Sequence, residues 1–150
     1  MKMLSLRANQ PSFHPVIFKD GINIIVGKQL TPHNENDGNT YNGVGKSLLL
    51  HLIHFCLGSN KIDSFTAKLP DWKFTLEFEI DGEKYDSTRC TTEQNKINFC
   101  GEKITAKVMR QKMLELCFGI SNPPKNLTWI TLFSRFARRH RSCYETFDSF

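Results

Sequence analysis

The segment from Lys73 to Cys90 constrains the fold more than any other part of the sequence, because its pattern is that of a β-hairpin. Between Lys73 and Ile80, apolar residues occupy every even position and polar residues every odd position. This period of two is typical of a strand with one buried and one solvated face. Asp81-Gly82 then supplies a two-residue turn, and the chain returns from Glu83 to Cys90. The sequence therefore predicts an antiparallel hairpin with one wet face.

The rest of the chain predicts further strands and helices. The other strands are expected over residues 3–8, 16–18, 22–26 and 97–104, the last as a small hairpin. The helices are expected over residues 45–57, 106–118 and 127–141. The run 22–26 is apolar throughout, so we expect a strand buried on both faces. The helix 45–57 is apolar almost all round, which predicts burial between layers. With 150 residues, these elements predict one α/β domain with α+β elements.

Composition excludes several classes of protein. Hydrophobic residues make up 39% and charged residues 23%, which suits a packed core and excludes collagen, coiled-coil and low-complexity chains. The longest apolar stretch, 48–57, falls short of the ~18 residues of a membrane span. The N-terminus lacks the features of a signal peptide, so we expect a cytoplasmic protein with no membrane partner. The five cysteines form no C-x-x-C pair and are expected to be free thiols.

Residues 42–47, Asn-Gly-Val-Gly-Lys-Ser, carry the clearest chemical signal. They follow a β-rich run and a polar loop, and they open the predicted apolar helix. Glycines let the backbone approach a ligand closely, and successive N–H groups at a helix N-terminus form a nest for anions. Lys46 is expected to reach the β- and γ-phosphates of a nucleotide, and the Ser47 hydroxyl to bind Mg²⁺. The segment therefore predicts a phosphate-binding loop.

The spacing of this loop departs from the G-x-x-x-x-G-K-[S/T] pattern, because Thr40 stands where the first glycine belongs. Gly27 lies at the end of the predicted strand and can take that role. This reading leaves 17 residues between Gly27 and Gly45 instead of 4, an insertion of 13. Loop-closure entropy grows only logarithmically with length, so the polar insert 28–41 can be accommodated.

The chain resembles the N-terminal head of SMC/RecN/RecF-type ABC ATPases. The resemblance rests on Phe18-x-x-Gly21-x-Asn23-x-Ile25-Val26-Gly27, on residues 42–47, and on Ile53-x-Phe55-x-Leu57-Gly58. It is closest to bacterial SMC-like ATPases with an insert inside the P-loop, some of which serve in anti-phage defence or DNA repair. It is specific over residues 1–59 and looser up to 141. It implies a P-loop NTPase, in which a P-loop part (1–59) precedes an antiparallel β subdomain (72–105) and helices (106–142).

The resemblance also implies a function. Heads of this family bind ATP and Mg²⁺, dimerise around two nucleotides and act on DNA, and a coiled coil extends from each head. By this resemblance, the residues expected to bind the phosphates are Gly27, Asn42, Gly43, Val44, Gly45, Lys46 and Ser47, and Ser47 is also expected to bind the metal.

The later motifs of the family are missing from the sequence. There is no run of four apolar residues followed by Asp-Glu, which would supply the Walker B acids, and no Ser-Gly-Gly signature. The acids between Glu77 and Asp81 are expected to face water, and neither Gln94 nor Gln111 fits the family's glutamine loop. No catalytic residue can be assigned. We therefore expect an incomplete head, inactive alone, that depends on a homodimeric or split-head partner for both motifs.

Other features have two readings each. Four arginines lie close together in the sequence and could either bind DNA phosphates or form an ordinary solvated helix face. They are Arg135, Arg138, Arg139 and Arg141. His51 and His54 lack the converging ligands of a metal site and are expected in the core or an interface. Phe13 could flank an adenine ring, but packing is the expected role. Two alternative functions stay open, a compact P-loop kinase and a non-hydrolysing nucleotide-sensing or assembly module.

Overall fold

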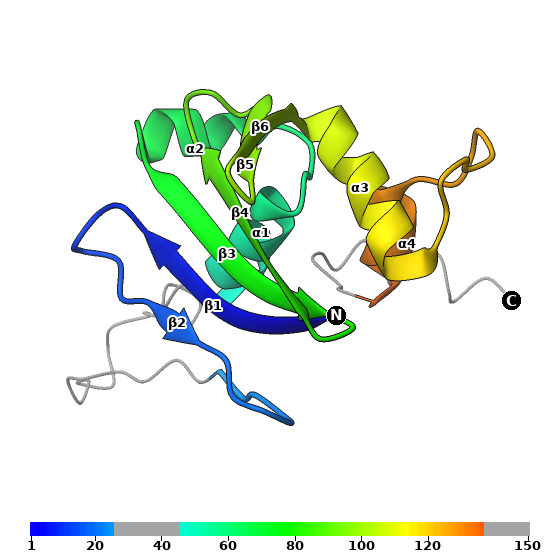
Figure 1. The fold of residues 1–150 in the computed structure, drawn as a ribbon. Coiled ribbons are helices and arrows are strands. Elements are labelled where there is room, and N and C mark those ends of the chain that lie inside the picture. Colours follow the sequence, from blue (N-terminus) through cyan, green and yellow to red (C-terminus); the bar gives the residue numbers. More distant parts are fainter. Residues whose placement is uncertain (26–45, 137–150) are drawn as a thin grey trace, which may run out of the picture.

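The computed structural model describes residues 1–25 and 46–136 of the chain. Six strands there form one sheet in the order β2-β1-β3-β4-β5-β6, and every neighbouring pair is antiparallel (Figure 1). The strands are β1 (Lys2–Ala8), β2 (Val16–Ile17), β3 (Lys73–Ile80), β4 (Glu83–Cys90), β5 (Lys96–Phe99) and β6 (Glu102–Thr105). The helices are α1 (Lys46–Cys56), α2 (Asp63–Lys68), α3 (Ala106–Phe118) and α4 (Trp129–Phe136). The described residues therefore form an α+β fold.

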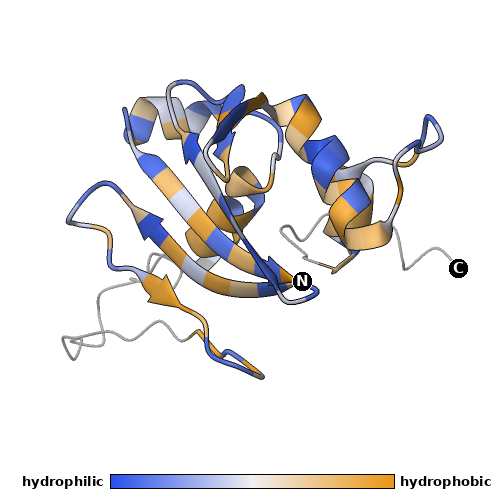
Figure 2. Ribbon diagram, viewed as in Figure 1, coloured by the Kyte–Doolittle hydropathy of each residue, from blue (hydrophilic) through white to orange (hydrophobic). Residues whose placement is uncertain are grey.

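The β3–β4 hairpin is confirmed in full. Its strands pair from Lys73 with Cys90 to Ile80 with Glu83. Asp81 and Gly82 have φ values of 51° and 88°, the left-handed pair that a tight hairpin turn requires. The apolar residues of β3 all face the core and alternate with polar ones along the strand (Figure 2): Phe74, Leu76, Phe78 and Ile80.

Helix α1 covers one face of this sheet and contacts β3 and β4. Its second half is buried, with Phe55 and Cys56 at 0% exposure, as is Leu57 directly after the helix. Its first turn is not buried, because Ser47 and Leu48 are exposed. The predicted helix is confirmed. The expected burial on all sides is found only in its second half, which reaches the centre of the sheet.

The predicted strand 22–26 is wrong over the residues that are described. Residues 22–25 belong to no strand, and Ile22 and Ile24 are 92% and 81% exposed. Asn23 instead holds a local turn, since its side chain accepts a hydrogen bond from Lys19 N at 2.8 Å and donates one to Lys19 O at 2.8 Å. A strand needs a neighbour, and no described strand lies beside this run. Its β-forming side chains are left in solvent.

The second hairpin and α3 follow the prediction closely. The side chain of Thr105 caps the first turn of α3 by accepting from Val108 N, and Gly119 ends the helix with φ of 66°.

Helix α4 begins at Trp129, two residues later than expected, because Thr128 and Thr131 exchange backbone-to-hydroxyl hydrogen bonds and cap it there. Helix α2 was not predicted, since only Phe65 of its six residues is buried.

No helix within 1–25 and 46–136 combines the length and the apolar character needed to cross a membrane.

Gly58 closes α1 and should resist substitution more than an ordinary capping glycine. Its φ is +84°, and an added Cβ would lie 3.2 Å from Met109 Cγ and 3.4 Å from Ala106 O. We expect Gly58→Ala to lower the free energy of unfolding by about 2 kcal/mol, from the left-handed backbone and the tight contact together. Gly119→Ala is the matched control, because its Cβ would meet nothing within 4 Å, and should cost only about 1 kcal/mol. Urea unfolding measures both, and equal losses would rule out the contact with α3 as a cause.

Candidate nucleotide-binding site

The predicted phosphate loop meets the described fold at the start of α1. Lys46 is the first residue of this helix, and Ser47 is exposed in its first turn. Gly27, Asn42, Gly43, Val44, Gly45 and the side chain of Lys46 lie outside the described residues. The structure thus gives the Lys-Ser pair the position at a helix N-terminus that a phosphate loop requires.

The opposite end of α1 is held in the core by Arg89 of β4, which is 1% exposed. Its Nη1 donates to Phe55 O at 2.7 Å and to Ser59 O at 2.9 Å, and its Nε donates to Gln94 O at 2.7 Å. The guanidinium also lies 4.4 Å from the centre of the Phe55 ring. Burial lowers the pKa of Arg89 to about 10, so the side chain is still a cation at neutral pH. A cation there complements the negative end of the helix dipole.

Two further side chains satisfy carbonyl groups at the last residue of α1 and at the residue after it. Ser87 Oγ donates to Cys56 O at 2.6 Å, and Trp129 Nε1 donates to Leu57 O at 2.8 Å. Carbonyl groups at a helix C-terminus have no N–H donor within the helix. Donors from β4 and α4 take the place of water here. The helix is therefore fixed at its C-terminal end, and its first residue lies about 15 Å away, at a rise of ~1.5 Å per residue.

Sequence reasoning missed Arg89 and Ser87, although the strand register could have revealed them. Arg89 is opposite Phe74 and Ser87 is opposite Leu76, so both share the buried face of the hairpin. A buried arginine and serine on an inward face must find hydrogen-bond acceptors. The unpaired carbonyls at a helix C-terminus are natural candidates.

Gln94 has a structural role in the turn after β4. It is 1% exposed, its Oε1 accepts from Ile62 N at 2.8 Å, and its Nε2 donates to Ile62 O at 2.9 Å. Nε2 also lies 2.9 Å from Thr66 Oγ1 and from Thr91 O. Gln94 therefore ties the segment around α2 to the turn after β4.

The acids of β3 lie on the solvated face, as expected. Glu77 accepts from Ser5 Oγ at 2.8 Å and forms an ion pair with Arg7. Asp81 is exposed in the hairpin turn. These groups lie on the face of the sheet opposite α1, away from the helix that would carry the phosphates.

The remaining candidates are only partly described. Arg135 is exposed in the last turn of α4, whereas Arg138, Arg139 and Arg141 lie outside the described residues. His54 is buried, with its ring 4.7 Å from that of Phe133. Phe13 packs edge-on against Phe74 at 5.6 Å, which confirms its packing role. No group of three or more His, Cys, Asp or Glu in the described part of the chain could hold a metal ion.

A comparison with protein-family models finds no match, and a comparison with curated proteins finds no significant relative. The assignment of function therefore depends on the residues themselves.

Proposed function

We propose that this chain is the ATP-binding N-terminal lobe of an SMC/RecN-like ABC ATPase. Such a lobe couples nucleotide-driven head dimerisation to DNA binding or processing, in repair or in phage defence. The observation that carries the proposal is the position of Lys46 and Ser47, which follow Gly45 in the sequence, at the start of α1, a helix whose other end is fixed in the core. A rigid helix with an exposed first turn can present backbone N–H groups to a phosphate without rearrangement.

The roles at the site follow from the residue types. Lys46 would bind the β- and γ-phosphates, and the Ser47 hydroxyl would bind the Mg²⁺ that bridges them. The exposure of Ser47 is compatible with this role, since the hydroxyl must be accessible to the metal. Residues 27 and 42–45 would complete the nest around the phosphates.

The exposed run Ile22–Ile25 supports the idea of an incomplete head. Its three isoleucines are between 46% and 92% exposed, which is unusual for a β-forming segment. In the proposed assembly, strands from the half that carries the Walker B and signature motifs would pair with this run. That half would come from a homodimeric or split-head partner or from further sequence.

The antiparallel sheet argues against the compact kinase. A self-contained P-loop kinase is built on a parallel sheet with crossover helices. All strand pairs of the described residues are antiparallel, so they do not form such a sheet by themselves.

Lys46→Ala tests the proposal directly. Loss of the ammonium group should weaken binding of a fluorescent ATP analogue in the presence of Mg²⁺ by about thirtyfold or more, because it leaves a phosphate charge unpaired in the site. Lys61→Ala, which removes an exposed lysine beyond the end of α1, should bind like the wild type. Equal affinities of the two variants would overturn every P-loop function of this chain, the sensing module included.

A further inference from the structure

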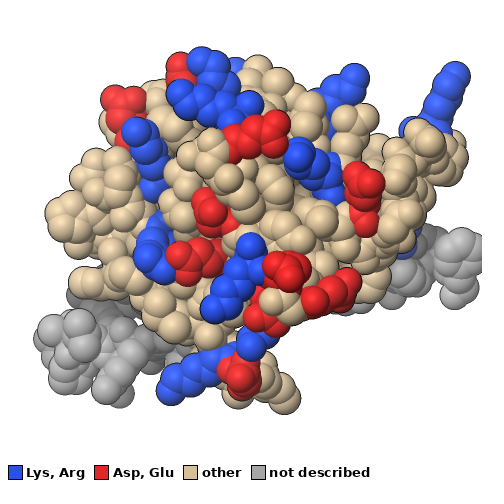
Figure 3. Space-filling view, viewed as in Figure 1, with Lys and Arg blue, Asp and Glu red and all other residues tan. Residues whose placement is uncertain are grey.

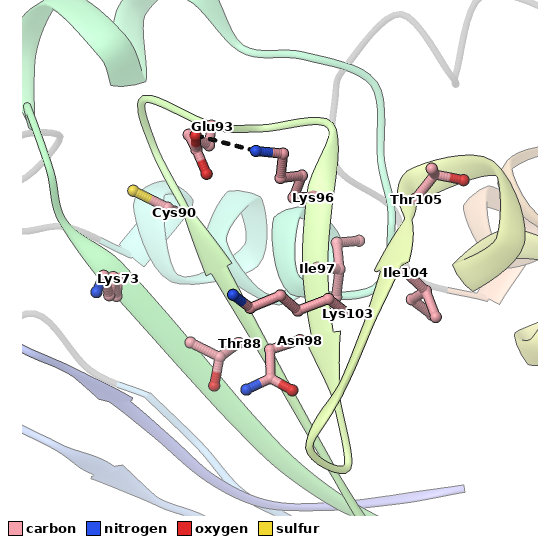
Figure 4. Close-up of a pocket in the computed structure, with 10 residues that line it drawn as sticks. All are labelled: Lys73, Thr88, Cys90, Glu93, Lys96, Ile97, Asn98, Lys103, Ile104 and Thr105. Atoms are coloured by element: carbon pink, nitrogen blue, oxygen red, sulfur yellow. Dashed lines mark hydrogen bonds and ion pairs between the residues drawn. The ribbon is translucent and has the colours of Figure 1, made fainter.

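A second candidate site lies on the solvated face of the sheet, opposite α1. Here β3, β4, β5 and β6 line an open cavity of about 540 Å³, within the usual size of a ligand site. Figure 4 shows that its side chains come from the four strands and from the turn after β4. Ser47, the one predicted phosphate-loop side chain that the structure describes, does not line it.

The strand register brings three lysines to this cavity. Lys73 begins β3, Lys96 begins β5, and Lys103 lies on β6 opposite Asn98. In Figure 4, the side chain of Lys103 extends across β5 toward β4. The polar side chains between the lysines are a hydroxyl, an amide and a second hydroxyl, each able to donate as well as accept a hydrogen bond: Thr88, Asn98 and Thr105.

The charge of the cavity is positive, because its lining holds three lysines and one acid. Lys96 forms an ion pair with that acid, Glu93, at 3.2 Å. Lys73 and Lys103 form no ion pair with any residue in the described ranges. Two ammonium groups therefore face the cavity without a carboxylate.

The rest of the same face is balanced in charge. Arg7 pairs with Glu77, and Lys84 lies opposite Glu79 in the register. Figure 3 shows both signs interspersed over the visible surface. The excess of positive charge is thus a local property of the cavity and not of the whole face.

We propose that this cavity binds a phosphate ester, held by Lys73 and Lys103 and by the neighbouring hydroxyl and amide donors. Compact ammonium groups on flexible stems bind phosphate as point charges, and hydroxyl and amide groups complete the coordination. The phosphate can belong to a nucleic-acid strand lying across the open cavity or to a free nucleotide. This site goes beyond the proposed function, because it is separate from the start of α1 and does not need a P-loop.

Cys90 provides a reporter inside the cavity. It lines the cavity beside Lys73, its strand partner, and is half-buried. Partial burial opposes ionisation of its thiol, but hydrogen bonds from the Thr92 hydroxyl and from the N–H groups of Thr92 and Glu93 outweigh it, so the pKa of Cys90 is lowered. The thiol should therefore react with iodoacetamide faster than an unperturbed thiol of the same exposure, and a bound ligand should shield it.

The experiment uses the Lys46→Ala chain, so that the phosphate loop does not contribute. A fluorescein-labelled oligothymidylate of about 15 nucleotides is titrated by anisotropy against this chain and against two double variants built on it. Lys73→Gln with Lys103→Gln removes both free ammonium groups of the cavity. Lys84→Gln with Lys125→Gln is the matched control, since it removes the same charge from exposed sites outside the cavity. Thermal melting checks that all three chains fold.

We expect the cavity variant to bind the strand roughly tenfold more weakly than the control, since two exposed charge contacts are lost. The slope of log K against log salt concentration should become shallower by about 1.4, at ~0.7 per phosphate contact. Bound oligonucleotide should slow alkylation of Cys90, followed by peptide mass spectrometry. Alkylation of Cys100, which is exposed in the β5–β6 turn, should not change.

Parallel titrations with AMP and with inorganic phosphate separate the two sources of phosphate. If AMP protects Cys90 and the oligonucleotide does not, the ligand is a free phosphate ester and the site stands. If the oligonucleotide protects more strongly, the ligand is a strand. The proposal is overturned if no probe protects Cys90, or if the cavity variant and the control bind all probes equally.

Discussion

Replacing Arg89 with methionine is expected to lower the free energy of unfolding by about 4 kcal/mol, one of the two largest effects expected for a single substitution in this fold. Methionine keeps much of the volume and the contact with Phe55, so the loss comes from hydrogen bonds. It would leave the buried Ser59 O and Gln94 O without their donor, and Phe55 O with only the N–H of Gly58, 3.2 Å away. Each unsatisfied buried acceptor costs roughly 1–3 kcal/mol. Since small domains are stable by only about 5–15 kcal/mol, such a loss takes a large share.

Urea unfolding followed by tryptophan fluorescence measures this effect. Arg110→Met is the matched control, because Arg110 is half-buried and its one side-chain hydrogen bond goes to Asn60 Oδ1 at 3.2 Å. That variant should lose less than about 1 kcal/mol. Arg89→Lys should fall between the two, as it keeps the charge but has fewer donors. If Arg89→Met is as stable as the control, the C-terminal end of α1 is not held in the way described.

Trp129→Ala is expected to cost about 4 kcal/mol as well, for a different reason. The indole is 2% exposed, stacks on Phe133 at 4.7 Å and donates to Leu57 O. Truncation would open a cavity between α4 and the end of α1, and removing a buried tryptophan side chain costs about 3–5 kcal/mol.

Two companion variants separate the contributions of Trp129. Trp129→Phe keeps most of the ring packing and removes the hydrogen bond, so it should cost about 1–2 kcal/mol. Phe136→Ala truncates an aromatic residue of the same helix that is 74% exposed, and should cost less than about 1 kcal/mol. Circular dichroism during urea unfolding suits all three, since it does not depend on the tryptophan. Similar losses for Trp129→Ala and Phe136→Ala would show that α4 is not anchored through the indole.

Local patterns in the sequence were sufficient to predict those elements that one short segment specifies by itself. The β3–β4 hairpin is predictable because the alternation from Lys73 to Ile80 and the Asp81-Gly82 turn specify it within one short segment. The ends of α3 are predictable for the same reason, since Thr105 and Gly119 are its caps. At the candidate site, the start of α1 after Gly45 could be predicted from the segment itself.

Contacts between distant segments could not be predicted in this way. The apolar run at residues 22–25 has the composition of a buried strand, but a strand also needs a neighbour, and composition does not show whether one is present. The link between Arg89 and Phe55 O spans 34 residues and depends on where α1 crosses the sheet. The lysines of the solvated cavity are separated by up to 30 positions and are brought together only by the order of the strands.

The central claim is that the start of α1 holds a triphosphate, and a crystal structure grown with Mg²⁺ and a non-hydrolysable ATP analogue tests it most directly. We predict that the β- and γ-phosphates lie within hydrogen-bond distance of the backbone N–H groups of residues 43–47 and of Lys46 Nζ, with Mg²⁺ on Ser47 Oγ. An empty helix start, a nucleotide bound elsewhere, or the insert 28–41 folded into that position would contradict the account.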